Sequence, residues 1–252
     1  MVYEERFYRD YHLNRDLFRF RVAQGESDLL ILASEDIEKK AYVALKECRA
    51  ILKDYGSAHP NFFKSLVPLE CHECAPKLIK HMHQASLKAG VGPMATVAGA
   101  VAQYIGEMLP FCKELIIENG GDLYMRSTAE RHIAIYAGTS PFSNKLAIKI
   151  KGEQTPLGIC TSAGTFGHSF SFGKVDAAMI LSKDTFLADA VATAVGNRIQ
   201  NEESIQEAID YARQIEGILG ILIIYRDKLG VWGDIEIEPL RLNITTSNLF
   251  KG

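Results

Sequence analysis

The middle of the chain carries a series of short apolar segments that are separated by turns rather than by helices. These segments have the length and the composition of β-strands. They read ELIIE, DLYM, HIAIYA, LAIKIK, LGICTS and DAAMILS, between residues 114 and 182. Strands that follow one another in this way, with helices grouped before and after them, are typical of an α+β fold and not of regular βαβ alternation.

Helical periodicity and one hairpin occupy the rest of the chain. Apolar residues at helical spacing predict a helix that has Ser34 as its N-cap and ends near Gly56. The other expected elements are helices from Pro76 to about Lys88, after Gly92-Pro93 up to Leu109, over 185–196 and over 203–215, a hairpin over 18–33, and the closing strands GILIIYRD and DIEIEPL. Because no low-complexity linker interrupts them, we expect residues 1–252 to form a single domain. A distant duplication of two halves is compatible with the sequence but is not visible in it.

Composition excludes several classes of protein. The chain is 47% hydrophobic and 23% charged, which is typical of a globular protein and not of a disordered one. It has 28 Lys and Arg against 31 Asp and Glu and no basic run, so we expect no nucleic-acid partner. No apolar stretch is long enough for a bilayer, and the charged N-terminus lacks a signal-peptide core. Together with an odd number of cysteines, five, these features predict a cytoplasmic protein without a membrane partner.

The segment GICTSAGTFGHSFSFG, residues 158–173, is rich in glycine and hydroxyl side chains. Small residues leave backbone N–H groups accessible, and such concavities bind phosphate or carboxylate. His168 adds a titratable group beside this loop. The alternative is a tight turn whose hydroxyls only cap its own backbone. A turn of that kind uses two or three such residues, so we interpret the longer run as a ligand site.

Two shorter motifs are ambiguous by themselves. The segment ENGGDLY contains Asn119-Gly120, a strong hairpin signal, so its glycines and Asp122 have a structural explanation. Asp189 and Thr193 are four residues apart and share one face of a helix. Their oxygen atoms are suited to Mg²⁺ together with waters and a phosphate. A helix cap and a buried threonine bonded to its own backbone explain the same pair equally well.

One cysteine motif suggests a metal or redox site but lacks the rest of the pattern. Cys71 and Cys74 form a CxxC pair, followed by His81 and His83. Zinc could use such ligands, yet no second cysteine pair is present and the two histidines would point in different directions on a helix. The βαβ context of a dithiol redox motif is also missing. We therefore favour cysteines without a chemical role.

Several motifs occur together in a fixed order. They are AGVGPMATVAGAVA, ENGGDLYM, YAGTSPFSNKLAI, GICTSAGTFGHSFSFGKVDA, LADAVATAVGN and KLGVWGDIEI. This set resembles an uncharacterised prokaryotic family related to the ApbE flavin transferases, once called thiamine-biosynthesis lipoproteins, over nearly the whole chain. The resemblance implies an ApbE-like fold of mixed, mostly antiparallel sheets with packed helices. In ApbE proteins a Gly-Gly-Asp turn, a Ser-Thr-Ser-Gly stretch leading to a histidine, and an Ala-Asp-Ala-x-Ala-Thr helix surround a flavin dinucleotide.

The resemblance carries specific roles over to this sequence. It implies catalytic roles for His168 and Asp122, and a Mg²⁺ site at Asp189 and Thr193. Cys160 stands where ApbE-like proteins carry serine. The expected cofactor-binding residues are Gly120, Gly121, Asp122, Thr161, Ser162, Gly164, Thr165, His168 and Ser169.

The sequence also departs from the ApbE pattern. His168 is followed by Ser169-Phe170-Ser171 instead of Asp-Pro, and the glycine-rich helix entry lacks the lysine of ApbE. We expect a cytoplasmic protein, a homodimer, that binds FAD, FMN or a related phosphorylated nucleotide, with Mg²⁺-dependent transfer or hydrolysis. The alternative is a binding or accessory protein without transferase activity in sulfur assimilation and homocysteine formation in anaerobes. In that role Cys160 would take part as a thiol whose pKa is lowered by the loop. For Cys160 itself we favour an inert buried thiol.

Overall fold

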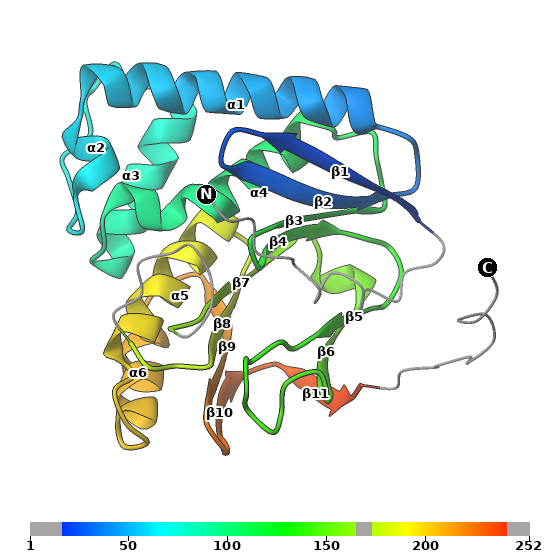
Figure 1. Cartoon of the computed structure of the whole chain (residues 1–252), viewed down its shortest axis with the longest axis vertical. Helices are drawn as coiled ribbons and strands as arrows, with labels where there is room; N and C mark the ends of the chain where they lie inside the picture. Colours follow the sequence, from blue (N-terminus) through cyan, green and yellow to red (C-terminus); the bar gives the residue numbers. More distant parts are fainter. Residues whose placement is uncertain (1–16, 165–172, 241–252) are drawn as a thin grey trace, which may run out of the picture.

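The main structural element is an eight-stranded antiparallel sheet with the order β1-β2-β3-β4-β7-β8-β9-β10 (Figure 1). The structure, a computed structural model, describes residues 17–164 and 173–240. The strands are β1 (Phe18–Gln24), β2 (Ser27–Ala33), β3 (Leu115–Asn119), β4 (Asp122–Arg126), β7 (Leu157–Ser162), β8 (Ala177–Ser182), β9 (Ile218–Tyr225) and β10 (Lys228–Gly233). The expected α+β class, with antiparallel sheets and packed helices, is confirmed.

A second, smaller sheet is built largely from the chain between β4 and β7. It has the order β11-β6-β5 and is also antiparallel. Its strands are β5 (Arg131–Ala134), β6 (Leu146–Ile150) and β11 (Glu236–Pro239). The small sheet packs on the face of the main sheet that is opposite to the helices (Figure 1).

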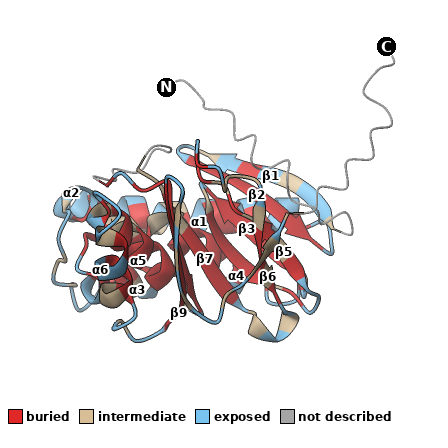
Figure 2. Ribbon diagram, turned by 90° about the horizontal axis from the view of Figure 1, so that it is seen from below, coloured by how far each residue is buried: buried red, intermediate tan, exposed pale blue. Residues whose placement is uncertain are grey.

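The helices cover the other face of the main sheet. They are α1 (Glu38–Ala58), α2 (Asn61–Lys64), α3 (Lys77–Ala89), α4 (Val97–Met108), α5 (Thr185–Arg198) and α6 (Ser204–Ala212), with 3-10 turns η2 (Pro93–Thr96) and η3 (Gly152–Gln154). The α5 helix packs on β7, β8, α3 and α4, and nearly all its residues are buried (Figure 2). The helix is rich in alanine and has apolar residues on all sides, which is the pattern of a helix buried in the interior of a protein.

The main sheet separates two hydrophobic cores. Side chains alternate between the faces of a strand, so Ile117 in β3 packs toward the helices and its neighbour Ile116 packs toward the small sheet. Strands β2, β3 and β8 are consequently buried on both faces. This double burial explains why these strands read as continuous apolar runs rather than as alternating patterns.

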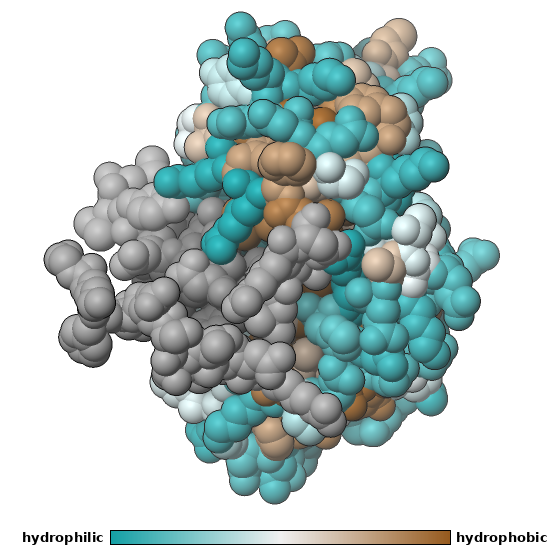
Figure 3. Space-filling model, turned by 90° about the vertical axis from the view of Figure 1, so that its right-hand side faces the viewer, coloured by the Kyte–Doolittle hydropathy of each residue, from teal (hydrophilic) through white to brown (hydrophobic). Residues whose placement is uncertain are grey.

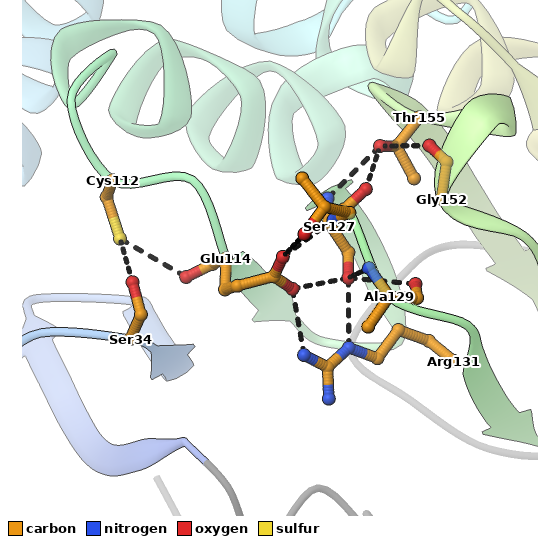
Figure 4. A network of polar contacts seen from close by, with 9 residues as sticks. Ser34, Cys112, Glu114, Ser127, Ala129, Arg131, Gly152 and Thr155 are labelled. Atoms are coloured by element: carbon orange, nitrogen blue, oxygen red, sulfur yellow. Dashed lines mark hydrogen bonds and ion pairs between the residues drawn. The ribbon is translucent and has the colours of Figure 1, made fainter.

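A polar network ties the two sheets together (Figure 4). Glu114 precedes β3, and its carboxylate accepts hydrogen bonds from Arg131 Nη2 at 2.8 Å and from Ser127 Oγ at 2.5 Å. It also accepts from the backbone N–H of Thr128 at 2.7 Å. Burial alone would raise the pKa of Glu114, but these hydrogen bonds outweigh burial and lower the pKa to about 2.

The expected start of the first helix is wrong. The Ser34 backbone N–H donates to the Glu114 carbonyl at 3.0 Å, which extends the strand pairing. The α1 helix begins later, with Ile37 at its N-cap position and no side-chain cap. Ser34 Oγ instead lies 3.7 Å from Cys112 Sγ (Figure 4).

The coloured part of the surface in Figure 3 is largely hydrophilic, with apolar side chains gathered mainly in its upper half. No helix in the described ranges is both long enough and apolar enough to pass through a membrane. Exposed large apolar residues among those described include Val43, Phe63, Leu66, Val67 and Leu87.

Candidate functional site

A cavity of about 1100 Å³ lies between the α1 helix, the start of α4 and the two sheets. The β3–β4 turn and the end of β7 form its polar end. Several predicted ligand residues line it, namely Gly120, Gly121, Asp122, Thr161 and Ser162. Two segments that are distant in sequence therefore meet at one cavity.

The β3–β4 turn is a two-residue hairpin loop. Asn119 pairs with Asp122 across it, and the loop residues Gly120 and Gly121 have φ angles of 69° and 103°. Glycine reaches these conformations without steric cost. The Gly121 N–H donates to Glu118 Oε1 at 2.8 Å, so the turn is held in place by its own strand.

Asp122 connects this turn to the end of β7. Its Oδ1 atom accepts a hydrogen bond from the backbone N–H of Thr161 at 3.0 Å. The side chain is buried. Burial and the nearby charge of Asp189 raise the pKa of Asp122 well above the usual value of a carboxyl group, although the Thr161 N–H opposes this shift.

Asp189 lies behind the start of α4. It projects from α5, and its Oδ2 atom accepts a hydrogen bond from the Gly99 backbone N–H at 2.9 Å. A Cβ atom on Gly99 would be 2.9 Å from the Cβ of Asp189 and would overlap the Thr185 carbonyl, so only glycine allows this approach. Burial raises the pKa of Asp189 to about 7, with the Gly99 and Ala98 N–H groups acting in the opposite direction.

Thr193 is one helical turn beyond Asp189 and is partly buried. Asp189 and Thr193 are not part of the cavity wall, which at this point is formed by Ala98. In the parts of the chain that the structure describes, no group of three or more His, Cys, Asp and Glu side chains is arranged to hold a metal ion. A cation at Asp189 would therefore need oxygen ligands from Thr193, water or a bound molecule.

The remaining predicted residues lie elsewhere or outside the described ranges. Gly164 packs against the backbone of Gly173, where a Cβ would overlap the Gly173 carbonyl, and its N–H donates to the Val175 carbonyl at 2.8 Å. It does not line the cavity, whose wall is formed by the neighbouring Ala163. The other three predicted residues lie outside the described residues: Thr165, His168 and Ser169.

The cysteines have ordinary environments. Burial, followed by the charges of Asp122 and Asp189, raises the pKa of Cys160 well above its usual value, so this thiol is not a reactive thiolate. Cys71 and Cys74 are free and border a separate depression of about 910 Å³.

The two histidines that follow the CxxC motif have different partners. His81 Nε2 is 2.8 Å from Asp184 Oδ2, whereas His83 Nδ1 is 3.0 Å from the Leu69 carbonyl oxygen. Their divergence agrees with the expectation from the sequence that side chains two residues apart on a helix point in different directions.

Several residues of the cavity were not expected from the sequence. The α1 helix contributes Lys46, Arg49 and Lys53, and α2 contributes Phe63. The spacing of the three cations places them on one face of the helix, and this pattern in the sequence could have indicated a positively charged helix face. Also, Asn119 Nδ2 donates to the Ala98 carbonyl at 3.1 Å, which fixes the β3–β4 turn to α4.

Known proteins are similar in sequence to this chain over most of its length. The chain is 35% identical over 240 residues to a UPF0280 protein of Methanocaldococcus jannaschii, covering 92% of this chain and 98% of that one. It is 39% identical over 217 residues to a UPF0280 protein of Methanosarcina acetivorans, covering 84% and 85%.

Solved structures share the architecture at low sequence identity. The apo flavinyl transferase ApbE of Pseudomonas stutzeri superposes with a TM-score of 0.53 at 13% identity, over 86% of this chain and 94% of that one. The ApbE protein of Thermotoga maritima gives a TM-score of 0.53 at 12% identity, over 85% and 96%. The family model described as "AbpE bacteria" matches residues 9–224. The chain therefore belongs to this family, and its fold is that of the ApbE flavin transferases.

Proposed function

We propose that this protein binds a flavin or a related phosphorylated nucleotide in the cavity and acts on it with the help of Mg²⁺. The observation that carries the proposal is the meeting of the β3–β4 turn and the end of β7 at one cavity, with Asp189 held behind the start of α4 next to it. Asp122 bonds to Thr161 at 3.0 Å, and Asp189 bonds to Gly99 at 2.9 Å, next to cavity residue Ala98. The ApbE neighbours named as flavin transferases support the choice of ligand.

The backbone around this end is suited to phosphate. Gly120 and Gly121 allow a ligand to approach the main chain closely, because they carry no side chain. Thr161 and Ser162 provide hydroxyl groups beside them. We assign the phosphate oxygens to these residues, with the organic part of the ligand in the rest of the cavity.

The two buried carboxyl groups fit a divalent cation. The charge of Asp189 contributes to the raised pKa of Asp122, so the two groups disfavour each other's ionisation. A hard cation favours carboxylate and hydroxyl oxygens, and Asp189 and Thr193 would be the residues that hold it. When bound, Mg²⁺ would neutralise the charge that develops as a phosphoanhydride breaks.

The protein's own residues would position the reacting groups. Asp122 is fixed by the Thr161 N–H, and its raised pKa favours the protonated form, which would give its proton to a ligand oxygen. His168, by its position in the sequence, is the second candidate for proton exchange with the acceptor. Burial of both aspartates excludes bulk water from their oxygens.

The test is a titration of the purified chain with FAD and FMN, with and without Mg²⁺, followed by fluorescence. We expect Mg²⁺ to tighten binding in the natural protein and to have no effect in Asp189→Asn. Asp234→Asn, which changes an exposed carboxyl group away from the cavity, is the matched control. Absence of binding by either flavin under both conditions would refute the proposal.

Other parts of the proposal rest on the sequence. A single domain, a homodimer and a cytoplasmic location stay predictions. The alternative role in sulfur assimilation depended on Cys160 as a reactive thiol with a lowered pKa. The burial of Cys160 and its raised pKa remove that argument, and we favour the nucleotide-binding role.

A further inference from the structure

The cavity wall formed by α1 differs in charge from the polar end. Lys46, Arg49 and Lys53 are spaced by three and four residues, so they share one face of the helix, and all three line the cavity. Arg49 Nη1 donates to Ser27 Oγ at 2.7 Å and its other nitrogen pairs with Glu26. Lys46 and Lys53 have no ion pair with a described residue. Two lysines without a described ion-pair partner therefore lie on either side of Arg49, which is held by Ser27 and Glu26.

Beside these cations lies an apolar surface with an exposed aromatic ring. Phe63 of α2 is 44% exposed, although it lines the cavity. Its ring lies directly over Gly56, where any Cβ would overlap it, and it meets Phe62 edge to face at 5.6 Å. The other apolar members of this wall are Leu52, Met94, Val97 and Val101.

This combination selects a particular kind of ligand group. A ring that is held by the backbone below it and by a second ring offers a flat surface for stacking. Ammonium groups at the edge of such a surface favour an anion that is attached to the stacked group. Neither feature is needed to close the hydrophobic core, because Phe63 and both lysines are exposed.

We propose that α1 and α2 form an amphipathic subsite that takes a planar aromatic group against Phe63 and an anionic group of the same ligand between Lys46 and Lys53. The chemical class is an aromatic anion, such as a nucleotide or a flavin phosphate. This inference rests on the proposed function in assigning a small ligand to the cavity. It adds a second anion-binding position, distant in sequence from the glycine-rich turn.

Two dyes test the subsite without any flavin. The sulfonated dye 8-anilinonaphthalene-1-sulfonate carries an anion, and N-phenyl-1-naphthylamine has the same ring system without it. In the double variant Lys46→Gln/Lys53→Gln we expect the affinity for the sulfonated dye to fall about tenfold, as for two partly exposed charge contacts. The affinity for the neutral dye should not change.

The control is Lys77→Gln/Lys88→Gln, which removes two positive charges from exposed positions of α3 outside the cavity. It should bind both dyes as the natural protein does. Phe63→Leu keeps an apolar side chain but removes the flat aromatic ring, so it should weaken the binding of both dyes. Equal binding of the sulfonated dye by the two double variants would overturn the proposal. The proposal would also be overturned if Lys46→Gln/Lys53→Gln weakened binding of the neutral dye as much as binding of the sulfonated dye.

The same variants are then titrated with FMN and riboflavin, which differ by one phosphate group. Selective loss of FMN binding in Lys46→Gln/Lys53→Gln would extend the subsite to flavins. If the natural protein binds no flavin but the dye results hold, the proposed function fails and the amphipathic subsite stands. If flavins bind but the sulfonated dye does not distinguish the double variants, the subsite fails and the proposed function stands.

Discussion

Asp189 and Gly99 are joined by a hydrogen bond of 2.9 Å from the Gly99 backbone N–H to the Asp189 carboxylate. The bond connects the first turn of α4 with the second turn of α5. It also stabilises the ionised carboxylate in a buried position, since N–H groups at the start of a helix favour negative charge. One aspartate thus both fixes two helices and supplies a buried acidic group beside the cavity.

The first prediction concerns the removal of this acceptor. Asp189→Ala leaves the buried Gly99 N–H without a partner, which should cost about 1–3 kcal/mol of the free energy of unfolding. Asp189→Asn keeps an oxygen acceptor and removes the buried charge, so its stability should equal or exceed that of the natural protein at neutral pH. Urea unfolding of the three proteins measures both differences. Equal stability of the Ala and Asn variants would contradict the role of the hydrogen bond.

The second prediction concerns the space at Gly99. In Gly99→Ala the new Cβ would lie 2.9 Å from the Asp189 Cβ and overlap the Thr185 carbonyl. The two helices would have to move apart, which we expect to cost about 1–3 kcal/mol, as for other overpacked sites. Thermal unfolding monitored by circular dichroism gives the change. A variant with unaltered stability would show that the helices can separate freely here.

The third prediction is a pH dependence that comes from Asp189. Its pKa is raised to about 7, whereas an unfolded aspartate has a pKa of about 3.9. Between these values the folded state binds a proton that the unfolded state has released, so rising pH lowers the free energy of unfolding across this window. The contribution is fully present below about pH 3.9 and is lost by about pH 7.

Comparison with Asp189→Asn isolates this effect. The difference in unfolding free energy between the natural protein and the variant, measured at several pH values, should change in favour of the variant as the pH rises from 4 to 7. Saturating Mg²⁺ with a bound nucleotide should shrink the change, because a cation stabilises the ionised carboxylate. A difference that is constant with pH would contradict the raised pKa.

The fourth prediction has the opposite sign and concerns Glu114. Its pKa is lowered to about 2, against about 4.3 in an unfolded chain, so its stabilising contribution is lost as the pH falls through this window. Glu114→Gln should lose about 1–3 kcal/mol at neutral pH, because its amide cannot replace the charged partner of Arg131 at 2.8 Å. Acid unfolding of the variant should accordingly be less steep between pH 4 and pH 2. Glu153→Gln, at an exposed position, is the control.

Much of the architecture follows from local sequence patterns. The 18–33 hairpin and the strands of the middle region were predicted because apolar runs between turns are local signals and need no knowledge of distant partners. That the segments of Asp122 and Thr161 meet at one ligand site was expected only through the family resemblance, and the hydrogen bond between them was not predicted. The residues themselves allowed a simple turn at Gly120-Gly121, and a long-range hydrogen bond leaves no mark on either segment alone.

The misses have tertiary causes. Ser34 has the chemistry of a helix cap, but pairing with the Glu114 carbonyl takes precedence. The strand β10 was not predicted, because Gly230 interrupts its pattern. A Cβ at this position would be 2.5 Å from the Ile205 side chain in α6, so glycine gives that helix room to pack on the strand. Lys46 and Lys53 were overlooked because a charged helix face usually faces bulk solvent, and only the folded chain shows the cavity beside them.

The small sheet has a consequence for biosynthesis. Its central strand β6 pairs with β5 on one side and with β11 on the other, and Ile237 of β11 packs on the core behind the main sheet. Chains fold from the N-terminus as they leave the ribosome, so a nascent chain exposes the edge of β6 until β11 has emerged. An unpaired edge of this kind invites aggregation. Translation pauses or truncations before β11 should consequently recruit chaperones, even though all the helices that the structure describes have by then been synthesised.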